Sequence, residues 1–144
     1  MLESLISTKA PASVALIRLA VGAIFLSEGI QKFLFSDALG VGRFIKIGIP
    51  APEFMAPFVA ILEISCGMLV LVGLLARLAA IPLIITMLVA IATTKIPILL
   101  KSGFWAMAHE ARTDFAMLLG CLFLLIVGAG TGSLDANWGM KKRV

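Results

Sequence analysis

Four long apolar runs, separated by shorter polar stretches, dominate the chain. They cover residues 13–33, 54–75, 78–94 and 113–130. Each run approaches the roughly 20 residues that an α-helix needs to cross the hydrocarbon core of a bilayer. Backbone polar groups in lipid must be satisfied internally, so we interpret these runs as helices. The pattern predicts an all-α fold, a four-helix transmembrane bundle in which residues 1–144 form one integral membrane domain.

The connectors predict how the helices are joined. Only a few residues separate the second and third runs, and Gly73 and Arg77 suit the two ends of a tight helical hairpin. The longer connectors, 34–53 and 95–112, then lie on the other side of the membrane. Basic residues are nearly balanced between the two sides, and the basic end at 141–143 favours cytoplasmic termini. We expect the protein in the inner membrane of a bacterial or archaeal cell.

Composition supports a membrane protein and excludes several kinds of site. Hydrophobic residues make up 61% of the chain, charged residues only 14%, and the mean hydropathy is +1.12. A soluble domain of this size carries fewer apolar residues. One His and two Cys cannot form an all-protein zinc site without carboxylate ligands, and the sequence has no CxxC motif and no glycine-rich phosphate loop. We therefore expect contact with membrane lipids, no metal site and no nucleic-acid partner.

One face of the predicted first helix combines cations, an aromatic ring and glycines. Its members recur at spacings of three and four residues: Arg18, Gly22, Phe25, Gly29 and Lys32. At about 100° per residue they form a stripe roughly 80° wide. Small residues allow a second helix to approach closely in lipid. The stripe is therefore either a packing seam with its charges near the two interfaces or one wall of a ligand site.

Glu63 lies in the middle of the second apolar run. A carboxylate at this depth is costly unless it is protonated, paired or exposed to water, which makes it a candidate functional residue. If the first two helices are antiparallel and level at their ends, Arg18 and Glu63 differ in depth by about 9 Å, within reach of an ion pair. In the alternative, Glu63 has no firm partner and can take or give a proton. The sequence leaves both alternatives open.

A second polar cluster is expected where the longer connectors meet the helices. Its members are Glu28, Lys32, Lys95, His109 and Asp114. In one interpretation they form a polar pocket in which His109 relays a proton or donates a hydrogen bond. In the other, His109 is simply solvated and Asp114 stabilises the positive end of its helix. Cys66 and Cys121 are predicted at similar depths, and we interpret them as small buried residues.

The ordered set of motifs resembles the DoxX family of small four-helix membrane proteins. The resemblance covers about residues 14–136. The motifs are Arg18-x3-Gly22-x2-Phe25-x3-Gly29-x2-Lys32, Gly48-Ile49-Pro50, Glu63 with Gly67, Gly73-Leu74-x2-Arg77, and Gly128-x-Gly130-x2-Ser133-Leu134-Asp135. The resemblance implies functional positions at Arg18, Gly29, Lys32, Glu63 and Gly67. An acidic residue expected at the start of the fourth helix is matched by either Asp114 or Glu110.

The resemblance implies one functional hypothesis, and the composition of the chain suggests a second. Proteins resembling this one have been linked to thiosulfate:quinone or quinol oxidase complexes and to membrane assemblies that handle oxidative and sulfur stress. In the first hypothesis the chain is a subunit of a quinone-linked redox complex. Arg18, Phe25 and Glu63 hold a quinone, Lys32 and His109 lie nearer the surface, and no cofactor is covalently bound. Whether such a subunit is itself an enzyme stays open.

The second hypothesis is a non-catalytic scaffold or assembly subunit. A chain that lies almost entirely in the membrane and carries glycine seams suits contact with other membrane subunits or with further copies of itself. A small transporter is a third alternative, which would require an oligomer because four helices are few for a pathway.

Overall fold

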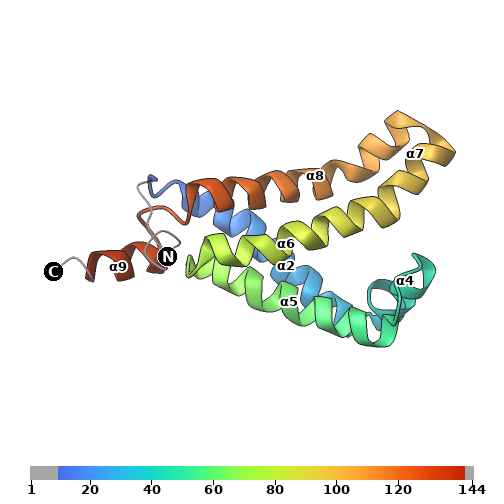
Figure 1. Cartoon of the computed structure of the whole chain (residues 1–144), viewed down its shortest axis with the longest axis horizontal. Helices are drawn as coiled ribbons and strands as arrows, with labels where there is room; N and C mark the ends of the chain where they lie inside the picture. Colours follow the sequence, from blue (N-terminus) through green and yellow to red (C-terminus); the bar gives the residue numbers. More distant parts are fainter. Residues whose placement is uncertain (1–9, 142–144) are drawn as a thin grey trace.

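The computed structural model describes residues 10–141, which form helices joined by short turns (Figure 1). Four of these helices are long: α2 (Val14–Leu34), α5 (Pro52–Val72), α6 (Ala76–Ala90) and α8 (Phe104–Val127). They form an elongated bundle in which α2 packs mainly against α5, and α6 packs mainly against α8. Contacts between α5 and α6 join the two pairs. The predicted all-α bundle is confirmed.

Shorter elements lie at the two ends of the bundle. At one, which we call the connector end, α3 (Ser36–Leu39) and α4 (Val41–Lys46) join α2 to α5, and the π-helix η1 (Ile91–Lys95) and α7 (Ile96–Ser102) continue α6. At the other, the terminal end, α9 (Leu134–Lys141) follows α8 near the α5–α6 hairpin (Figure 1). Lys142 and Arg143, on which the predicted orientation depends, lie outside the described residues.

Two predicted helix boundaries differ from the structure. The third predicted span, 78–94, is continued by η1 and α7 as far as Ser102. The helix predicted over 113–130 begins earlier, at Phe104, and ends at Val127. The cause is Gly103, whose positive φ of 84° lets one residue separate the two helices. The second long connector is therefore a helical hairpin.

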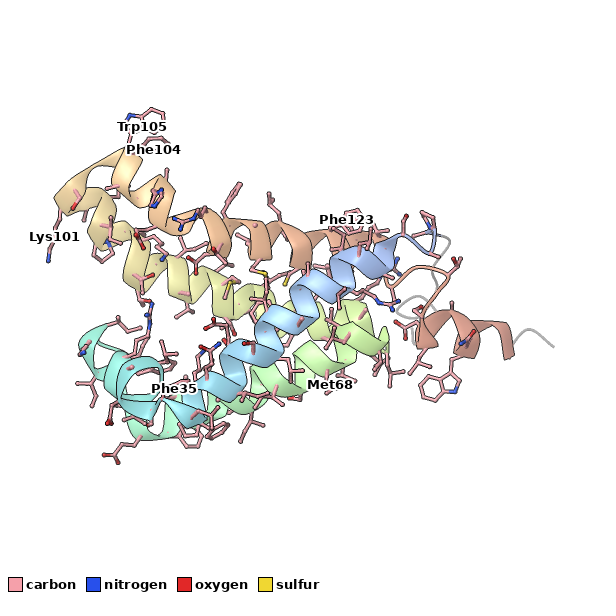
Figure 2. The ribbon with its side chains drawn as sticks, turned by 180° about the vertical axis from the view of Figure 1, so that it is seen from behind. Phe35, Met68, Lys101, Phe104, Trp105 and Phe123 are labelled. Atoms are coloured by element: carbon pink, nitrogen blue, oxygen red, sulfur yellow. The ribbon has the colours of Figure 1, made fainter. Side chains whose placement is uncertain are left out.

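Apolar side chains cover the outside of the bundle. Figure 2 shows Phe35, Met68 and Phe123 projecting from its surface, and each is exposed by more than a third. Among the described residues, three helical segments are long and apolar enough to cross a membrane: Val14–Leu34, Pro52–Val72 and Ala76–Ser102. The fourth long helix, α8, carries several charged residues in its first half. An apolar surface of this extent is satisfied by lipid, not by water.

The pair α2–α5 is held closely together by glycine. A Cβ atom at Gly22 would lie 2.8 Å from the carbonyl oxygen of Gly67, and one at Gly29 would lie 2.7 Å from the carbonyl oxygen of Ala60. Larger residues at these positions would collide with backbone atoms, which cannot move aside as a side chain can. The glycines of the predicted stripe therefore form an internal seam between α2 and α5, with Phe25 buried on the same helix.

Candidate functional site

A cavity of about 630 Å³ lies between α2, α5, α6 and α8, with α4 on its connector side. Aromatic and aliphatic side chains form most of its wall, among them Phe25, Phe44, Phe58 and Met117. Its polar side chains are Glu28, Lys32, Arg43, Glu63, Thr86, Thr93, Thr94, Thr113 and Asp114. Cavities of about 300–1,000 Å³ with mainly apolar walls and a few polar groups are typical of small-molecule sites.

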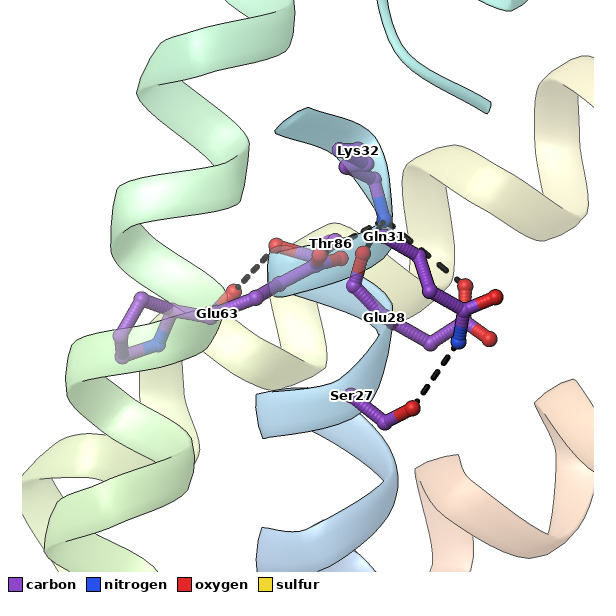
Figure 3. A network of polar contacts seen from close by, with 7 residues as sticks. Ser27, Glu28, Gln31, Lys32, Glu63 and Thr86 are labelled. Atoms are coloured by element: carbon purple, nitrogen blue, oxygen red, sulfur yellow. Dashed lines mark hydrogen bonds and ion pairs between the residues drawn. The ribbon is translucent and has the colours of Figure 1, made fainter. Parts of the chain in front are cut away.

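An ion pair between Lys32 and Glu63 forms part of the cavity wall (Figure 3). The Lys32 Nζ atom donates a hydrogen bond of 2.7 Å to Oε2 of Glu63, whose residue is only 2% exposed. The same Nζ atom lies 3.5 Å from the carbonyl oxygen of Glu28 and 3.9 Å from its carboxylate. A short bond between two charged groups is among the stronger hydrogen bonds in proteins. The pair thus joins α2 and α5 within an otherwise apolar region.

The ion pair between Arg18 and Glu63, one of the two alternatives that the sequence leaves open, does not form, because each residue has other partners. The glycine seam fixes the register of the two antiparallel helices, with Gly22 against Gly67. In this register Arg18 lies against Gly73, whose Cβ, if present, would be 2.6 Å from Nη1 of Arg18. Gly73 is ten residues after Glu63, or about 15 Å along a helix, too far for the pair. The prediction assumed helices that are level at their ends, whereas the seam offsets them.

Backbone carbonyl groups instead accept hydrogen bonds from the two Nη atoms of Arg18. Its Nη1 atom donates to the carbonyl oxygens of Ala129 at 2.9 Å and Gly132 at 3.1 Å, and Nη2 donates to that of Leu71 at 3.4 Å. The residue is only 7% exposed. Arg18 thereby ties α2 to the end of α5 and to the segment after α8. Its contacts are those of a structural residue.

Asp135 completes the arrangement at the terminal end. Its carboxylate accepts hydrogen bonds from the backbone N–H groups of Leu75 at 2.7 Å and Ala76 at 3.2 Å, at the start of α6. Its own backbone N–H donates to the carbonyl oxygen of Gly73. Burial raises the pKa of the Asp135 carboxyl, and the two hydrogen bonds that it accepts oppose this shift. We call Arg18 and Asp135, with their backbone partners, the terminal clamp.

A second ion pair lies at the connector end. Nζ of Lys95 is 3.1 Å from Oδ2 of Asp114, and Asp114 lies on the cavity wall. Lys95 ends the π-helix η1 and is only 8% exposed. Pro97 cannot donate a backbone hydrogen bond to the residue four positions before it, which favours a local departure from α-helical geometry. Single π-helical turns inside longer helices occur frequently at functional sites.

Four of the eight predicted site residues line the cavity: Phe25, Lys32, Glu63 and Asp114. Both candidate acids that were expected at the start of the fourth helix lie inside α8, with Asp114 on the cavity wall and Glu110 exposed. The other four predicted residues lie elsewhere.

The remaining predicted residues have other positions. Arg18 belongs to the terminal clamp, and Gly29 and Gly67 belong to the seam. His109 is exposed and is not on the cavity wall, so the predicted proton relay through His109 is not supported by the geometry. Its position explains this, because five residues separate it from Asp114, or about 140° around the helix.

Several cavity residues were missed by the sequence analysis. Thr86, Thr93 and Thr94 line the wall on the α6–η1 side, and Arg43 and Phe44 approach from α4. A spacing of seven to eight residues places threonines on one helix face, a signal that the sequence does contain. No comparable signal marks α4, because a short connector is positioned only by how it folds over the helices.

Neither of the two cysteine thiols lies on the cavity wall. Cys121 is fully buried in the core and Cys66 packs against that core; both are free thiols. Among residues 10–141, no group of three His, Cys, Asp or Glu side chains is placed to hold a metal ion. The distinctive chemical feature of the site is a mostly apolar cavity with the Lys32–Glu63 ion pair and Asp114 in its wall.

Together the helical bundle, its exposed apolar surface and the cavity between its helices define an integral membrane protein with a candidate small-molecule site. The sequence profile of the DoxX family matches residues 13–96, more than half of the chain. The protein belongs to the DoxX family. No solved structure matches the chain significantly.

Two relatives are similar over most of the chain. An uncharacterized membrane protein of Mycobacterium tuberculosis, Rv3486, is 55% identical over 137 residues, which cover 91% of this chain and 84% of the relative. A Bacillus subtilis protein named "Putative oxidoreductase CatD" is 32% identical over 120 residues, which cover 83% of this chain and 82% of the relative. The first name agrees with a membrane location, and the second concerns redox chemistry.

Proposed function

We propose that this protein is a redox-associated membrane protein that holds a quinone, or a lipid-soluble molecule of similar chemistry, in the cavity beside Lys32 and Glu63. The observation that carries the proposal is the placement of a buried ion pair in the wall of a mostly apolar cavity of about 630 Å³. The oxidoreductase name of the Bacillus subtilis relative supports the redox part.

The chemistry of a quinone suits these side chains. Each quinone carbonyl oxygen accepts hydrogen bonds, and it takes up a proton when the ring is reduced. Lys32 is a cationic donor, and Glu63 is a carboxylate that can carry a proton. Phe25 and Phe58 provide aromatic surface for a flat ring. The quinone supplies the redox chemistry, and the chain binds it, orients it and exchanges protons with it.

We also propose that the protein acts with other membrane-protein subunits or as a homo-oligomer in the bacterial cell membrane, with both termini cytoplasmic. The exposed apolar faces of the bundle are compatible with protein as well as lipid contacts. The glycine seam no longer argues for a purely structural scaffold, because its glycines pack α2 against α5 of the same chain and not against another subunit.

Native mass spectrometry tests the proposal. The full-length protein is extracted in mild detergent and titrated with decylubiquinone, a quinone with a short tail. We expect a one-to-one complex with the wild-type protein and at least about tenfold weaker binding by Glu63→Gln, since this variant loses the charge-assisted hydrogen bond that orients the Lys32 donor, and such a bond contributes roughly 1.5–3 kcal/mol.

Glu53→Gln is the matched control, because Glu53 is an exposed acid on the same helix and lies outside the cavity. It should bind decylubiquinone as the wild type does. Equal binding by Glu63→Gln and the wild type would contradict the proposed site. A stoichiometric protein partner, recovered without any quinone binding, would favour the scaffold.

A further inference from the structure

A second hollow, of about 560 Å³, adjoins the cavity at the connector end. The two share part of their lining, namely Arg43, Ile47, Thr93 and Thr94. The hollow is completed by Ala38, Lys46 and Pro97. It therefore lies between α4 and the junction of η1 with α7, where the bundle ends and the polar boundary of the membrane is expected.

The charge of this hollow differs from that of the cavity. Within the cavity region Lys32 is paired with Glu63, and Lys95 is paired with Asp114. In the hollow, Arg43 and Lys46 are three positions apart on α4, and the lining contains no acidic residue. Among the described residues neither cation forms an ion pair or donates a side-chain hydrogen bond. Two cations on one helix face thus remain available for an external anion.

We propose that this hollow binds the phosphate group of an anionic phospholipid. Arginine can contact two phosphate oxygens at once, and lysine adds a point charge beside it. Basic pockets between membrane helices are suited to anionic headgroups. The hollow adjoins the proposed quinone site and shares Arg43 with its wall, but the proposal does not depend on what occupies the cavity.

The surroundings of the hollow favour a lipid over a soluble phosphate compound. Ile47 and Pro97 give the hollow apolar lining, and Ile96, the neighbour of Pro97 in the chain, is 47% exposed. A headgroup held at Arg43 and Lys46 would leave its acyl chains beside such apolar surface. A soluble phosphate would gain nothing from it, because only a lipid can bury apolar area there.

Lipid binding to the purified full-length protein tests the proposal. Native mass spectrometry compares phosphatidylglycerol, phosphatidylcholine and inorganic phosphate as probes. Wild-type protein should bind phosphatidylglycerol at least about tenfold more tightly than phosphatidylcholine, because each basic residue near an anionic headgroup contributes on the order of a fivefold to tenfold gain. The double substitution Arg43→Gln with Lys46→Gln should remove this preference.

Lys101→Gln is the matched control, since Lys101 is an exposed cation at the same end of the molecule but outside the hollow (Figure 2). It should retain the preference for phosphatidylglycerol. Equal binding of the two lipids by the wild type, or an unchanged preference in the double variant, would overturn the proposal. So would saturation of the site by inorganic phosphate without any effect of lipid. Decylubiquinone binding measured in parallel separates failure of this site from failure of the quinone site.

Discussion

The two cations of α2 occupy the same stripe of one helix but have opposite environments. Arg18, at the terminal end, donates to three backbone carbonyl groups in the terminal clamp. Lys32, fourteen residues later, is bound to the Glu63 carboxylate in the wall of a cavity. At the terminal end, the hydrogen-bond acceptors of Arg18 are neutral carbonyl groups of the backbone. At the cavity, the partner of Lys32 is a carboxylate, which can change protonation. A similar sequence signal therefore marks a structural residue at one end and a candidate binding residue at the other.

The difference matters because the two arrangements respond differently to a ligand. Carbonyl acceptors that lie in the chain cannot leave or change protonation, so the contacts of Arg18 are fixed with the fold. An ion pair at a cavity can redistribute its hydrogen bonds when a ligand oxygen or a proton arrives. Buried ion pairs also add little stability compared with well-packed apolar residues. Retaining one inside an apolar cavity is thus better explained by binding than by folding.

The largest effect is expected from breaking the cavity pair. Lys32→Met should destabilise the protein by about 3–5 kcal/mol, because it leaves the Glu63 carboxylate buried and unpaired. Adding Glu63→Leu should restore stability to within about 1–2 kcal/mol of wild type, since both charges are then gone. Thermal unfolding of the purified variants in detergent measures both. The double variant should fold and yet fail to bind decylubiquinone. Normal binding by this variant would mean that Lys32, like Arg18, has only a structural role.

An intermediate effect is expected at the terminal clamp. Arg18→Gln should cost about 2–3 kcal/mol, because the carbonyl groups of Ala129 and Gly132, which accept a buried and a partly buried hydrogen bond, lose their donor. The same thermal unfolding measurement applies, with Lys101→Gln as an exposed control of matched chemistry. The folded fraction should bind decylubiquinone with wild-type affinity. A selective loss of binding in a stable Arg18→Gln protein would instead place Arg18 in the ligand site.

The smallest effect is expected from pH at Asp135. Burial raises its pKa in the folded protein above that of the unfolded chain, so the folded state binds the proton more tightly. This contribution to stability is full below the unfolded pKa and is lost as pH rises through the folded pKa. The midpoint of thermal unfolding should therefore increase as the pH is lowered through the folded pKa towards the ordinary pKa of an aspartate. The increase should be smaller in Asp135→Asn, which cannot titrate; an identical pH dependence would assign the effect to another group.

Sequence patterns predicted the helices well. Of the candidate site residues that they indicated, however, only half line the cavity in the structure. Phe25, Lys32, Glu63 and Asp114 share the wall, although the pairing proposed for Glu63 was wrong. The error came from helix register, which depends on where the glycines of α2 meet α5 and not on where each helix begins. His109 was misplaced for a related reason, since its direction depends on the early start of α8.

By itself, the sequence determined that this chain is an all-helical membrane protein with charged residues at a few internal positions. Continuous apolar runs are sufficient for that conclusion, because lipid leaves helices as the way to satisfy the backbone. Only the tertiary structure decided which charges meet. The close contact at Gly22, Gly29 and Gly67 offsets α2 along α5. Because of this offset, Glu63 pairs with Lys32, whereas Arg18 donates hydrogen bonds to carbonyl groups at the terminal end. Pairing at a distance of a few ångströms depends on that offset, which local sequence does not encode.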